Sequence, residues 1–471
     1  MSPHYSILQV NTVDNRGGAA RIAWTLHRAY QKLGLRAWMA VGQKFSDDPA
    51  VLLIPNQEAT AWATRTGLKA ASVALDSGFW GMRRLGKALR SVAELGRMWD
   101  LSQGIEDFRY PGTWRLLELT SELPDIVHCH NLHGGYFDLR ALSWLNQQVP
   151  VVLTLHDAWL LSGHCAHSFD CERWKTGCGH CPDLTIYPAI RRDATAYNWR
   201  RRRAIYARSR FYVATPCRWL MQKVEQSVLA PAVLETRVIP YGIDLSVFRP
   251  AGRRGVRAAL GIPQDAKVLL CAGVGIRRSP WKDWPTMREA VDLVADRLHD
   301  QHVLFIALGD DAPAGRVGRA EIRFVPYQDD PKCVAPYYQA ADVYVHPAKA
   351  DTFPNVVLEA LACGAPVVAT AVGGIPEQVK GLKTSDLRSE QPDWNRYEIN
   401  QATGILVPPE DPAAMAAGIV SLLTAETLHR QLSENAVQDA HERFDLNRQV
   451  QAYLDWYAMI LTRRQVERST A

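Results

Sequence analysis

Residues 351–377 contain the most informative pattern in the chain and read DTFPNVVLEALACGAPVVATAVGGIPE. Just before them, Val343 to Val345 predict a short buried strand, and within them Pro366 to Ala369 predict another. A helix is expected between the two strands, beginning near Pro354. The order strand, helix, strand is typical of a parallel βαβ unit.

The same alternation of short apolar strands and helical stretches continues on both sides of this unit. Further strands are expected at residues 7–10, 37–41, 126–129, 151–155, 211–214, 268–272, 303–308 and 322–325. The strands of a parallel sheet are buried on both faces and therefore have this apolar composition. The sequence thus predicts an α/β fold with two doubly wound domains.

Proline and glycine interrupt the strand and helix periods at residues 238–250, and the domain boundary is placed there. The predicted domains are an N-terminal one at 1–240, which includes a cysteine-rich loop at 163–184, and a C-terminal one at 241–449. Residues 450–471 are expected to form a helix that crosses back to the N-terminal domain.

The composition is that of a globular protein. Of 471 residues, 47% are hydrophobic and 22% charged, which excludes a disordered, collagenous or coiled-coil chain. The net charge of +5 is too small to indicate a nucleic-acid partner. Apolar runs are far shorter than the ~20 residues that cross a bilayer, and the beginning MSPHYSILQV lacks a signal-peptide pattern. A cytoplasmic protein is therefore expected.

Gly17 and Gly18 follow the first predicted strand and open a helix, which lets the backbone approach a diphosphate. The segment does not have the spacing G-x-G-x-x-G, and no suitable acidic residue closes a second strand nearby. These two facts argue against an NAD-dependent oxidoreductase. Because the fold serves many enzyme classes, the side-chain clusters must identify the chemistry.

Two clusters in the second half carry charge. Asp351 and Glu359 stand on either side of the expected helix start at Pro354, where free N–H groups can hold an anion or a sugar hydroxyl. Arg277, Arg278 and Lys282 lie in a loop after a strand, where such cations can stabilise a leaving diphosphate without a metal ion. We therefore expect no cofactor for catalysis.

Two histidines in the first half follow apolar strands. His130 and His156 should both emerge at the carboxyl edge of the sheet, where ligands bind in open α/β sheets. For a single histidine, packing in the core is the commoner explanation.

In this order the motifs resemble those of glycosyltransferase family 4, retaining enzymes of the GT-B fold in which two Rossmann-like domains face a cleft. The resemblance covers nearly the whole chain. It includes Gly17-Gly18-Ala19, the run from Ile239 to Asp244, and the run from Ala341 to Pro347. It implies transfer of a sugar from a nucleotide-diphosphate sugar to a glycan or a lipid-diphosphate-linked glycan.

The resemblance also implies roles for single residues. The implied catalytic residues are His156, Arg277, Lys282 and Asp351, and the implied donor-binding residues are Gly17, Gly18, Arg277, Lys282, Asp351, Phe353, Pro354, Asn355 and Glu359. His130 and Asp157 are implied on the acceptor side. Arg277 and Lys282 keep the family's spacing of five residues, with Arg278 as the alternative first cation. His156 is expected to position and polarise the donor, and Glu359 to hold its ribose.

Two positions depart from the family pattern. Asp351 stands where the family usually has Glu, and Asp283 replaces the usual glycine after Lys282. A non-catalytic carbohydrate-binding protein therefore stays open. The other alternative is a nucleotide-sugar epimerase of the same GT-B architecture, which would share the cleft but not this arrangement of Arg277, Lys282, Asp351 and Glu359. The motifs from His156-Asp157-x-Trp159 to Cys181-Pro182 resemble colanic-acid-type transferases, which implies a role in exopolysaccharide biosynthesis.

Four cysteines, Cys165, Cys171, Cys178 and Cys181, crowd into a polar, glycine-rich loop. Disulfides are disfavoured in a reducing cytoplasm, whereas four thiolates at such spacings can hold a structural Zn²⁺. Substitute ligands are His164, His167 or His180, and the alternatives are an iron–sulfur cluster or free, redox-active thiols.

Residues 65–97 combine seven basic side chains with an apolar stripe at helical spacing. This pattern predicts peripheral binding to an anionic membrane surface that carries a lipid-diphosphate acceptor. The alternative is an amphipathic helix packed on the N-terminal domain with a solvated basic face.

Overall fold

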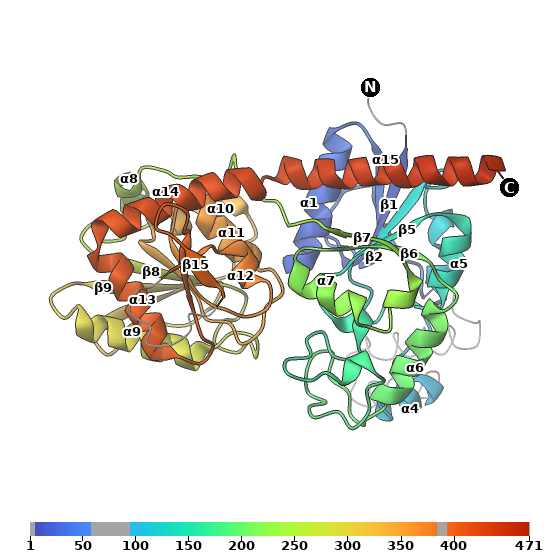
Figure 1. Cartoon of the computed structure of the whole chain (residues 1–471), viewed down its shortest axis with the longest axis horizontal. Helices are drawn as coiled ribbons and strands as arrows, with labels where there is room; N and C mark the ends of the chain where they lie inside the picture. The colour runs from blue at the N-terminus through green and yellow to red at the C-terminus, as the bar shows by residue number, and fades with distance from the viewer. Residues whose placement is uncertain (1–4, 58–94, 384–392, 471) are drawn as a thin grey trace, which may run out of the picture. The chain divides into compact units, whose positions relative to one another are not determined.

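The computed structural model describes residues 5–57, 95–383 and 393–470. These residues form two compact α/β units, each built on one largely parallel sheet whose strands alternate with helices (Figure 1). The first unit comprises the chain up to Thr215, the segment Leu220–Val238 and the residues from Tyr453 onwards. The second comprises Pro216–Trp219 and Ile239–Ala452. The predicted fold class, two doubly wound α/β domains, is confirmed.

The described part of the first unit contains a seven-stranded parallel sheet with the order β3-β2-β1-β4-β5-β6-β7. Its strands are β1 (Ser6–Val13), β2 (Arg36–Gln43), β3 (Val51–Leu53), β4 (Ile126–Cys129), β5 (Val151–Thr154), β6 (Phe211–Thr215) and β7 (Val233–Val238). Its helices are α1 (Gly18–Lys32), α4 (Leu95–Ser102), α5 (Ala141–Gln148), α6 (Thr195–Tyr206) and α7 (Arg218–Glu225). Short 3-10 helices are η1 (Pro111–Glu118), η2 (Trp159–Leu161), η3 (Arg173–Lys175) and η4 (Ala230–Ala232).

The described part of the second unit contains a nine-stranded sheet with the order β10-β11-β9-β8-β12-β13-β16-β14-β15, in which only the pair β10 and β11 is antiparallel. Its strands are β8 (Lys267–Ala272), β9 (Val303–Leu308), β10 (Gly315–Val317), β11 (Ala320–Val325), β12 (Val343–His346), β13 (Val367–Thr370), β14 (Gly381–Leu382), β15 (Asn395–Tyr397) and β16 (Gly404–Val407). Its helices are α8 (Arg253–Ala259), α9 (Trp284–Arg297), α10 (Pro331–Ala340), α11 (Asn355–Ala362), α12 (Ile375–Gln378), α13 (Pro412–Thr424) and α14 (Glu426–Arg443).

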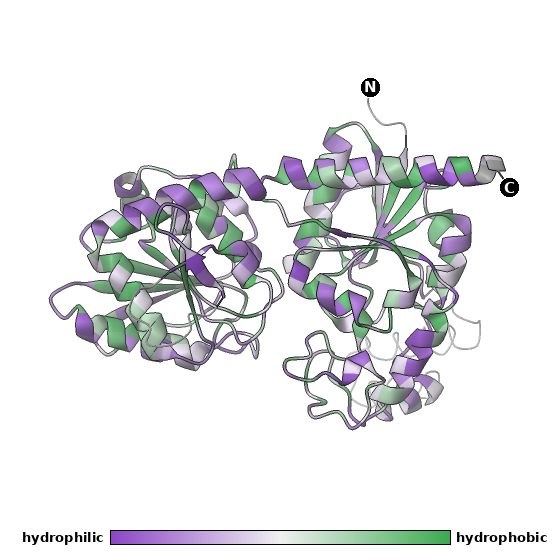
Figure 2. Ribbon diagram, in the orientation of Figure 1, coloured by the Kyte–Doolittle hydropathy of each residue, from purple (hydrophilic) through white to green (hydrophobic). Residues whose placement is uncertain are grey.

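The central strands form the cores of both units. Every residue of β9 is buried, as are all four residues of β4, β5 and β13. Figure 2 shows hydrophobic residues concentrated in these central strands. Burial of apolar surface contributes roughly 25 cal/mol per Å², so these strands supply much of the stability that holds the strand ends in place.

Three helices of the second unit begin with the same pair of residue types. Asp283, Asp330 and Asp411 each accept a hydrogen bond from a backbone N–H in the first turn, and a proline follows within two residues. The carboxylate satisfies an N–H that the helix leaves open, and proline suits the first helical position because its missing N–H costs nothing there. Asp283, which departs from the family pattern, is therefore the N-cap of α9.

The C-terminal helix α15 (Leu446–Thr470) groups with the first unit from Tyr453 onwards. The Tyr457 hydroxyl lies 2.6 Å from Nδ1 of His128 and 3.3 Å from the hydroxyl of Tyr30. The Tyr453 hydroxyl lies 2.8 Å from Oγ1 of Thr154, at the end of β5. The helix therefore supports the strands β4 and β5 from which the predicted histidines emerge.

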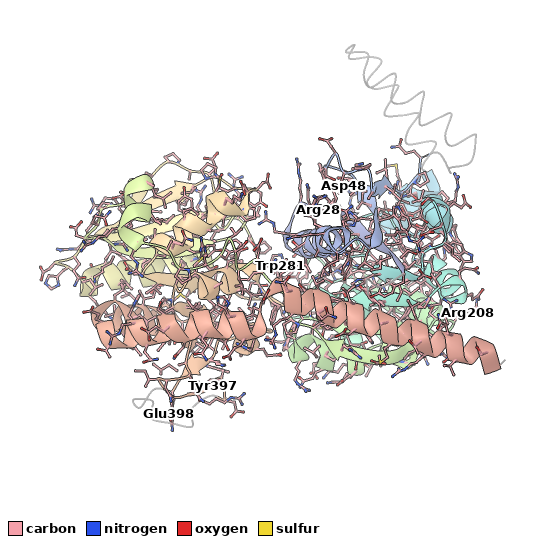
Figure 3. The ribbon with its side chains drawn as sticks, turned by 90° about the horizontal axis from the view of Figure 1, so that it is seen from above. Arg28, Asp48, Arg208, Trp281, Tyr397 and Glu398 are labelled. Carbon is pink, nitrogen blue, oxygen red and sulfur yellow. The ribbon has the colours of Figure 1, made fainter. Side chains whose placement is uncertain are left out.

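Other contacts of the first unit fasten the loop after β2. Arg28 of α1 and Asp48 of that loop form an ion pair of 2.9 Å, and Figure 3 labels both residues. Within the described ranges, none of the helices combines the length and the apolar composition that a membrane span requires. Of the predicted membrane-binding stretch at 65–97, only residues 95–97 are described.

Candidate functional site

The charged cluster of the second unit lies where the loops after β8 and β12 meet. Lys282 forms an isolated antiparallel bridge with Ala348, and Asp283 N–H donates to Pro347 O at 2.9 Å. Trp281, which Figure 3 labels, accepts at its carbonyl a hydrogen bond of 2.9 Å from Lys349 N–H. These backbone contacts bring the Lys282 side chain to the loop that carries Asp351.

Lys282, His346 and Asp351 form a compact triad. Lys282 Nζ donates to Asp351 Oδ2 at 2.8 Å, and His346 Nε2 lies 3.1 Å from Nζ and 3.3 Å from the same carboxylate oxygen. Burial alone would raise the pKa of Asp351, but the Lys282 charge and the His346 contact outweigh it and hold the pKa well below its usual range. The carboxylate is therefore ionised.

His346 is neutral and can bond to either partner. Burial, and then the Lys282 charge, lower the pKa of His346 to about 4. A bare Nε2 accepts from Lys282, whereas a protonated Nε2 donates to Asp351. The Tyr344 hydroxyl, 3.1 Å from Nδ1, complements both tautomers because it can donate or accept. The ring can thus follow a change in the partner of Lys282.

The predicted cationic side chains of the loop after β8 do not share one partner. Arg277 is engaged by Asp310, whose carboxylate lies 3.2 Å from Nε, and by the carbonyl of Asp311 at 3.1 Å from a guanidinium nitrogen. Arg278 is exposed, and its side chain has no hydrogen bond or ion pair in the described part of the chain. The structure therefore brings Lys282 and Asp351 together but directs Arg277 to Asp310.

The helix α11 begins next to this triad in sequence. Its N-cap residue Pro354 offers no side-chain hydrogen bond, and Oδ1 of Asn355 is buried without a partner among the described residues. Glu359, in the next turn, is buried and accepts a hydrogen bond of 2.8 Å from the Tyr338 hydroxyl. Phe353 packs edge-on against the rings of Tyr241 and Phe444. The start of α11 can therefore receive an anion or a hydroxyl.

A hydrogen-bonded chain runs from the middle of β1 to the residues that follow β4 and β5. Gln9 Nε2 donates to the carbonyl of Ala23 at 3.0 Å, which fixes this atom as the amide nitrogen, and it also lies 3.1 Å from His130 Nε2. His130 Nε2 must therefore accept. Its proton is on Nδ1, which donates to Nε2 of His156 at 3.0 Å.

This chain defines the state of His156. Burial lowers the pKa of His156 to about 4, so the ring is neutral, and because Nε2 accepts from His130 the proton lies on Nδ1. Burial, and then the rings of His128 and His156, lower the pKa of His130 well below its usual value. His156 is therefore a buried, neutral ring, and its role in positioning the donor stays a prediction.

Asp157 and the glycine turn complete the predicted set in the first unit. Asp157 Oδ2 lies 2.9 Å from Nε2 of His133, and Oδ1 accepts from the Trp159 N–H at 2.8 Å. Gly17 has a φ of +92°, a left-handed value that favours glycine, and side-chain atoms added at Gly17 or Gly18 would meet open space. The first turn of α1 has no side-chain cap and no acidic residue.

The sequence did not identify four residues that form hydrogen bonds in the candidate site: His133, Tyr338, Tyr344 and His346. His346 stands inside the run from Ala341 to Pro347 that carries the family resemblance, and a buried polar residue at the end of an apolar strand is the signal that could have marked it. The tyrosines give no such signal because their partners become clear only in three dimensions.

The four clustered cysteines are all free thiols. Burial, and then the neighbouring thiols, raise the pKa of Cys165, and burial raises the pKa of Cys178 to about 12. Nε2 of His164 lies 3.4 Å from Sγ of Cys181. Among the described residues, however, no group of three or more His, Cys, Asp or Glu is arranged to hold a metal ion. The loop as folded here does not present a zinc site, so bound zinc would require the thiols to converge.

Comparison with known proteins relates both halves of the chain to glycosyltransferases. Residues 16–247 match the model described as Glycosyltransferase Family 4, and residues 266–425 match that of Glycosyl transferases group 1. Over 232 residues the chain is 34% identical to the D-inositol 3-phosphate glycosyltransferase 2 of Catenulispora acidiphila, which corresponds to 46% of this chain and 49% of that protein. The chain thus spans about half the length of the curated relatives it matches first.

Solved structures show the fold. Sucrose-phosphate synthase from Thermosynechococcus elongatus superimposes with a TM-score of 0.58 at 18% identity, covering 98% of this chain and all of that one. HepE of Anabaena, in complex with UDP and glucose, gives 0.56 at 17% identity, covering 97% of this chain and 100% of that one. The fold is therefore GT-B, and both units correspond to glycosyltransferase domains.

Proposed function

We propose that the protein is a retaining glycosyltransferase that moves a sugar from a nucleotide-diphosphate sugar to a glycan or a lipid-linked glycan. The observation that carries the proposal is the triad of Lys282, His346 and Asp351, which stands in sequence directly before the uncapped start of α11. A cation and a set of free N–H groups suit a diphosphate. The domain matches over both halves of the chain support the reaction class.

In this proposal, the donor diphosphate draws Lys282 away from Asp351. His346 Nε2–H then donates to Asp351, so the buried carboxylate keeps a partner after the exchange. Arg277 or Arg278 supplies a second positive charge, and of the two only Arg278 has a side chain that no described residue engages. Positive charge placed in advance stabilises the negative charge that develops on the leaving diphosphate.

The first unit supplies the groups around the sugar and the acceptor. His156, held neutral with its proton on Nδ1, positions the donor sugar, and Asp157 with His133 lies on the acceptor side. The motifs from His156 to Cys181 support a branch that builds exopolysaccharide. We also propose that the protein acts at the inner face of a membrane, bound peripherally through basic residues.

A panel of UDP-, GDP- and dTDP-linked sugars tests the function. UDP-glucose is the first probe because HepE was solved in complex with UDP-glucose. A true donor at one hundred times its Kd should stabilise the folded protein by about 2.7 kcal/mol, which raises the thermal midpoint. Transfer to an acceptor glycan should then give a product whose anomeric configuration, read by NMR, matches that of the donor.

Four results would contradict the proposal in different ways. An inverted anomeric centre would refute retention, and release of an epimerised nucleotide sugar without an acceptor would identify the epimerase alternative. Binding of donor with neither hydrolysis nor transfer to any acceptor would favour the non-catalytic alternative. Failure of every nucleotide sugar to bind would remove the proposal altogether.

A further inference from the structure

A pocket of about 460 Å³ lies within the first unit, and none of its lining residues belongs to the triad of Lys282. Its walls come from α4, the loop after β4, η2, the start of the cysteine-rich loop, residues 188–191 and α6. Hydrogen bonds join α6 to the segment after α4, since Asn198 Nδ2 donates to Gly104 O at 2.9 Å and Asn198 Oδ1 accepts from Glu106 N–H at 3.0 Å. Figure 1 likewise shows α4 and α6 next to each other.

The walls of this pocket are mainly apolar. Met98 and Leu101 of α4 line it and are 48% and 46% exposed, while Leu132, Phe137 and Ile190 face it from the other elements. Apolar side chains left in contact with water favour a ligand that covers them. The pocket therefore suits a ligand with an apolar segment.

The floor of the pocket is rigid and electrically balanced. Arg202 is fully buried, forms an ion pair of 3.0 Å with Glu106 and donates to Ser162 O at 2.8 Å. Its guanidinium carbon lies 4.1 Å from the centre of the Trp159 ring. Because these partners already satisfy Arg202, its charge holds the wall together and is not available to a ligand.

The rim, in contrast, carries uncompensated positive charge. Arg191 lines the pocket, is exposed, and has no hydrogen bond or ion pair in the described part of the chain. Next to it in sequence, the Arg192 side chain donates, among the described residues, only to the neutral amide oxygen of Gln103, at 2.9 Å. The acidic lining residue Asp107 is paired with Arg97 at 2.6 Å. The rim therefore attracts an anion, and an arginine fork is well suited to a phosphate.

One lining residue connects the pocket to the predicted acceptor side. His133 lines it and bonds through Nε2 to Asp157, the residue that follows His156. A ligand in the pocket thus lies beside the residues expected to receive the acceptor hydroxyl.

We propose that this pocket binds a lipid phosphate, with the hydrocarbon chain against α4 and the phosphate at Arg191, and that it holds the lipid end of the acceptor. The last clause rests on the proposed glycosyltransferase function, whereas lipid-phosphate binding does not. An amphipathic ligand is favoured over a free oligosaccharide because the walls are apolar and the unpaired charge is confined to the rim.

Farnesyl phosphate is a suitable probe, and its binding can be measured by calorimetry on the whole chain without donor. Leu101→Glu and Arg191→Glu should each weaken binding at least tenfold. The matched controls are Leu123→Glu and Arg208→Glu, which change exposed residues of the same types in the first unit outside the pocket and should leave affinity within twofold. Farnesol should bind at least tenfold more weakly, and inorganic phosphate should not compete at millimolar concentration.

Met98→Glu serves as a second wall variant if Leu101→Glu fails to fold, as judged by its thermal midpoint. Equal affinity of the pocket variants and their controls, or equal affinity for farnesol and farnesyl phosphate, would overturn the proposal. Lys282→Ala should leave farnesyl phosphate binding unchanged. If the unaltered protein bound farnesyl phosphate but none of the nucleotide sugars, the result would count against the proposed function and not against the pocket.

Discussion

Lys282 is the residue on which the proposed donor chemistry depends most. Its Nζ donates to Asp351 Oδ2 at 2.8 Å, and His346 Nε2 lies 3.3 Å from the same carboxylate oxygen. Replacing Lys282 by Ala should lower turnover more than tenfold, because loss of a cation that stabilises the transition state typically costs about 2–4 kcal/mol. The fold should persist, since Asp351 retains His346 as a partner.

The matched control is Lys349→Ala, which removes an exposed lysine that lies in the loop carrying Asp351 and is paired with Glu410 at 2.7 Å. The measurements are kcat, KM for the donor and the thermal midpoint of each variant. If both variants turned over at the rate of the unaltered protein, Lys282 would have no role in the leaving-group site.

The contrast between Arg277 and His346 shows how far the sequence could predict the site. Spacing identified Lys282 and Asp351, which do meet, because both follow strands that end at the same edge of the sheet. Spacing could not show that Asp310, more than thirty residues beyond Arg277, engages the guanidinium. The role of His346 was not predicted because it depends on Lys282 and Asp351, which the chain brings together only in three dimensions.

Asp283 shows at the element scale why a departure from a family pattern need not be functional. Its carboxylate accepts from the Thr286 hydroxyl at 2.7 Å and from the Thr286 N–H, so it caps α9. Asp283→Ala should lower the free energy of unfolding by about 1 kcal/mol, as lost caps commonly do. Donor affinity should be unchanged, because neither capping bond involves the triad.

Urea unfolding measures this effect, with Asp300→Ala as the control because Asp300 is an exposed aspartate just beyond the end of the same helix. A loss of donor affinity in Asp283→Ala without any loss of stability would assign the residue to the site and not to the helix.

The cysteine-rich loop is the element for which structural zinc was predicted. The described thiols do not form a metal-holding group as folded here, yet neighbouring thiols contribute to the raised pKa values of Cys165 and Cys178. If zinc is the native partner, protein purified without a histidine tag should contain about one equivalent by elemental analysis. Cys178→Ser should then lower the zinc content and weaken acceptor use before donor binding.

Four titratable thiols in the native protein, with less than about a tenth of an equivalent of zinc or iron, would contradict the metal prediction and support free thiols. Iron with visible absorption would support the iron–sulfur alternative instead. Cys217→Ser is a suitable control, because Cys217 is buried outside this loop.

Strand prediction succeeded or failed for a clear physical reason. The predicted strand at 303–308 coincides with β9, whose residues are all apolar and buried. β10 and β15, which read GRV and NRY, lie at the two edges of the second sheet and contain too few apolar residues to show a period. Central strands are therefore visible in the sequence, whereas short edge strands form because a neighbouring strand offers hydrogen bonds.

At the scale of the whole molecule, buried neutral histidines should make stability depend on pH. Burial lowers the pKa of His128 to about 3 and the pKa values of His27, His156 and His346 to about 4. Between about pH 6.5 and pH 4 the unfolded chain binds protons that the folded one does not, so stability should fall as the pH decreases through this range.

The midpoint of urea unfolding at pH 7, 6 and 5 measures this trend. His27→Phe should reduce it, because His27 is buried on α1, outside the proposed site, with both ring nitrogens lacking a hydrogen-bond partner among the described residues. A midpoint that stayed constant from pH 7 to pH 5 would show that these histidines are not held neutral by the fold.

Membrane association would involve two basic stretches of the first unit. The stretch 65–97 carries seven basic residues against Asp76 and Glu94, and most of it lies outside the described residues. The second basic run, 200–203, contributes less than its sequence implies. Arg202 is buried with Glu106, and Arg201 donates to Glu106 O and covers the Phe108 ring. Only Arg200 and Arg203 of that run are exposed.

The stretch 65–97 should therefore dominate binding to anionic vesicles. Flotation with phosphatidylglycerol vesicles at low salt should recover the protein, and raising the salt should release it because the attraction is screened. Exchanging Arg83, Arg84, Lys87 and Arg90 for Glu should abolish flotation, whereas exchanging Arg200 and Arg203 should reduce it only slightly. If the unaltered protein stays with the soluble fraction even at low salt, the basic stretch is the solvated face of a packed helix, and the lipid phosphate must reach the pocket without a membrane-bound enzyme.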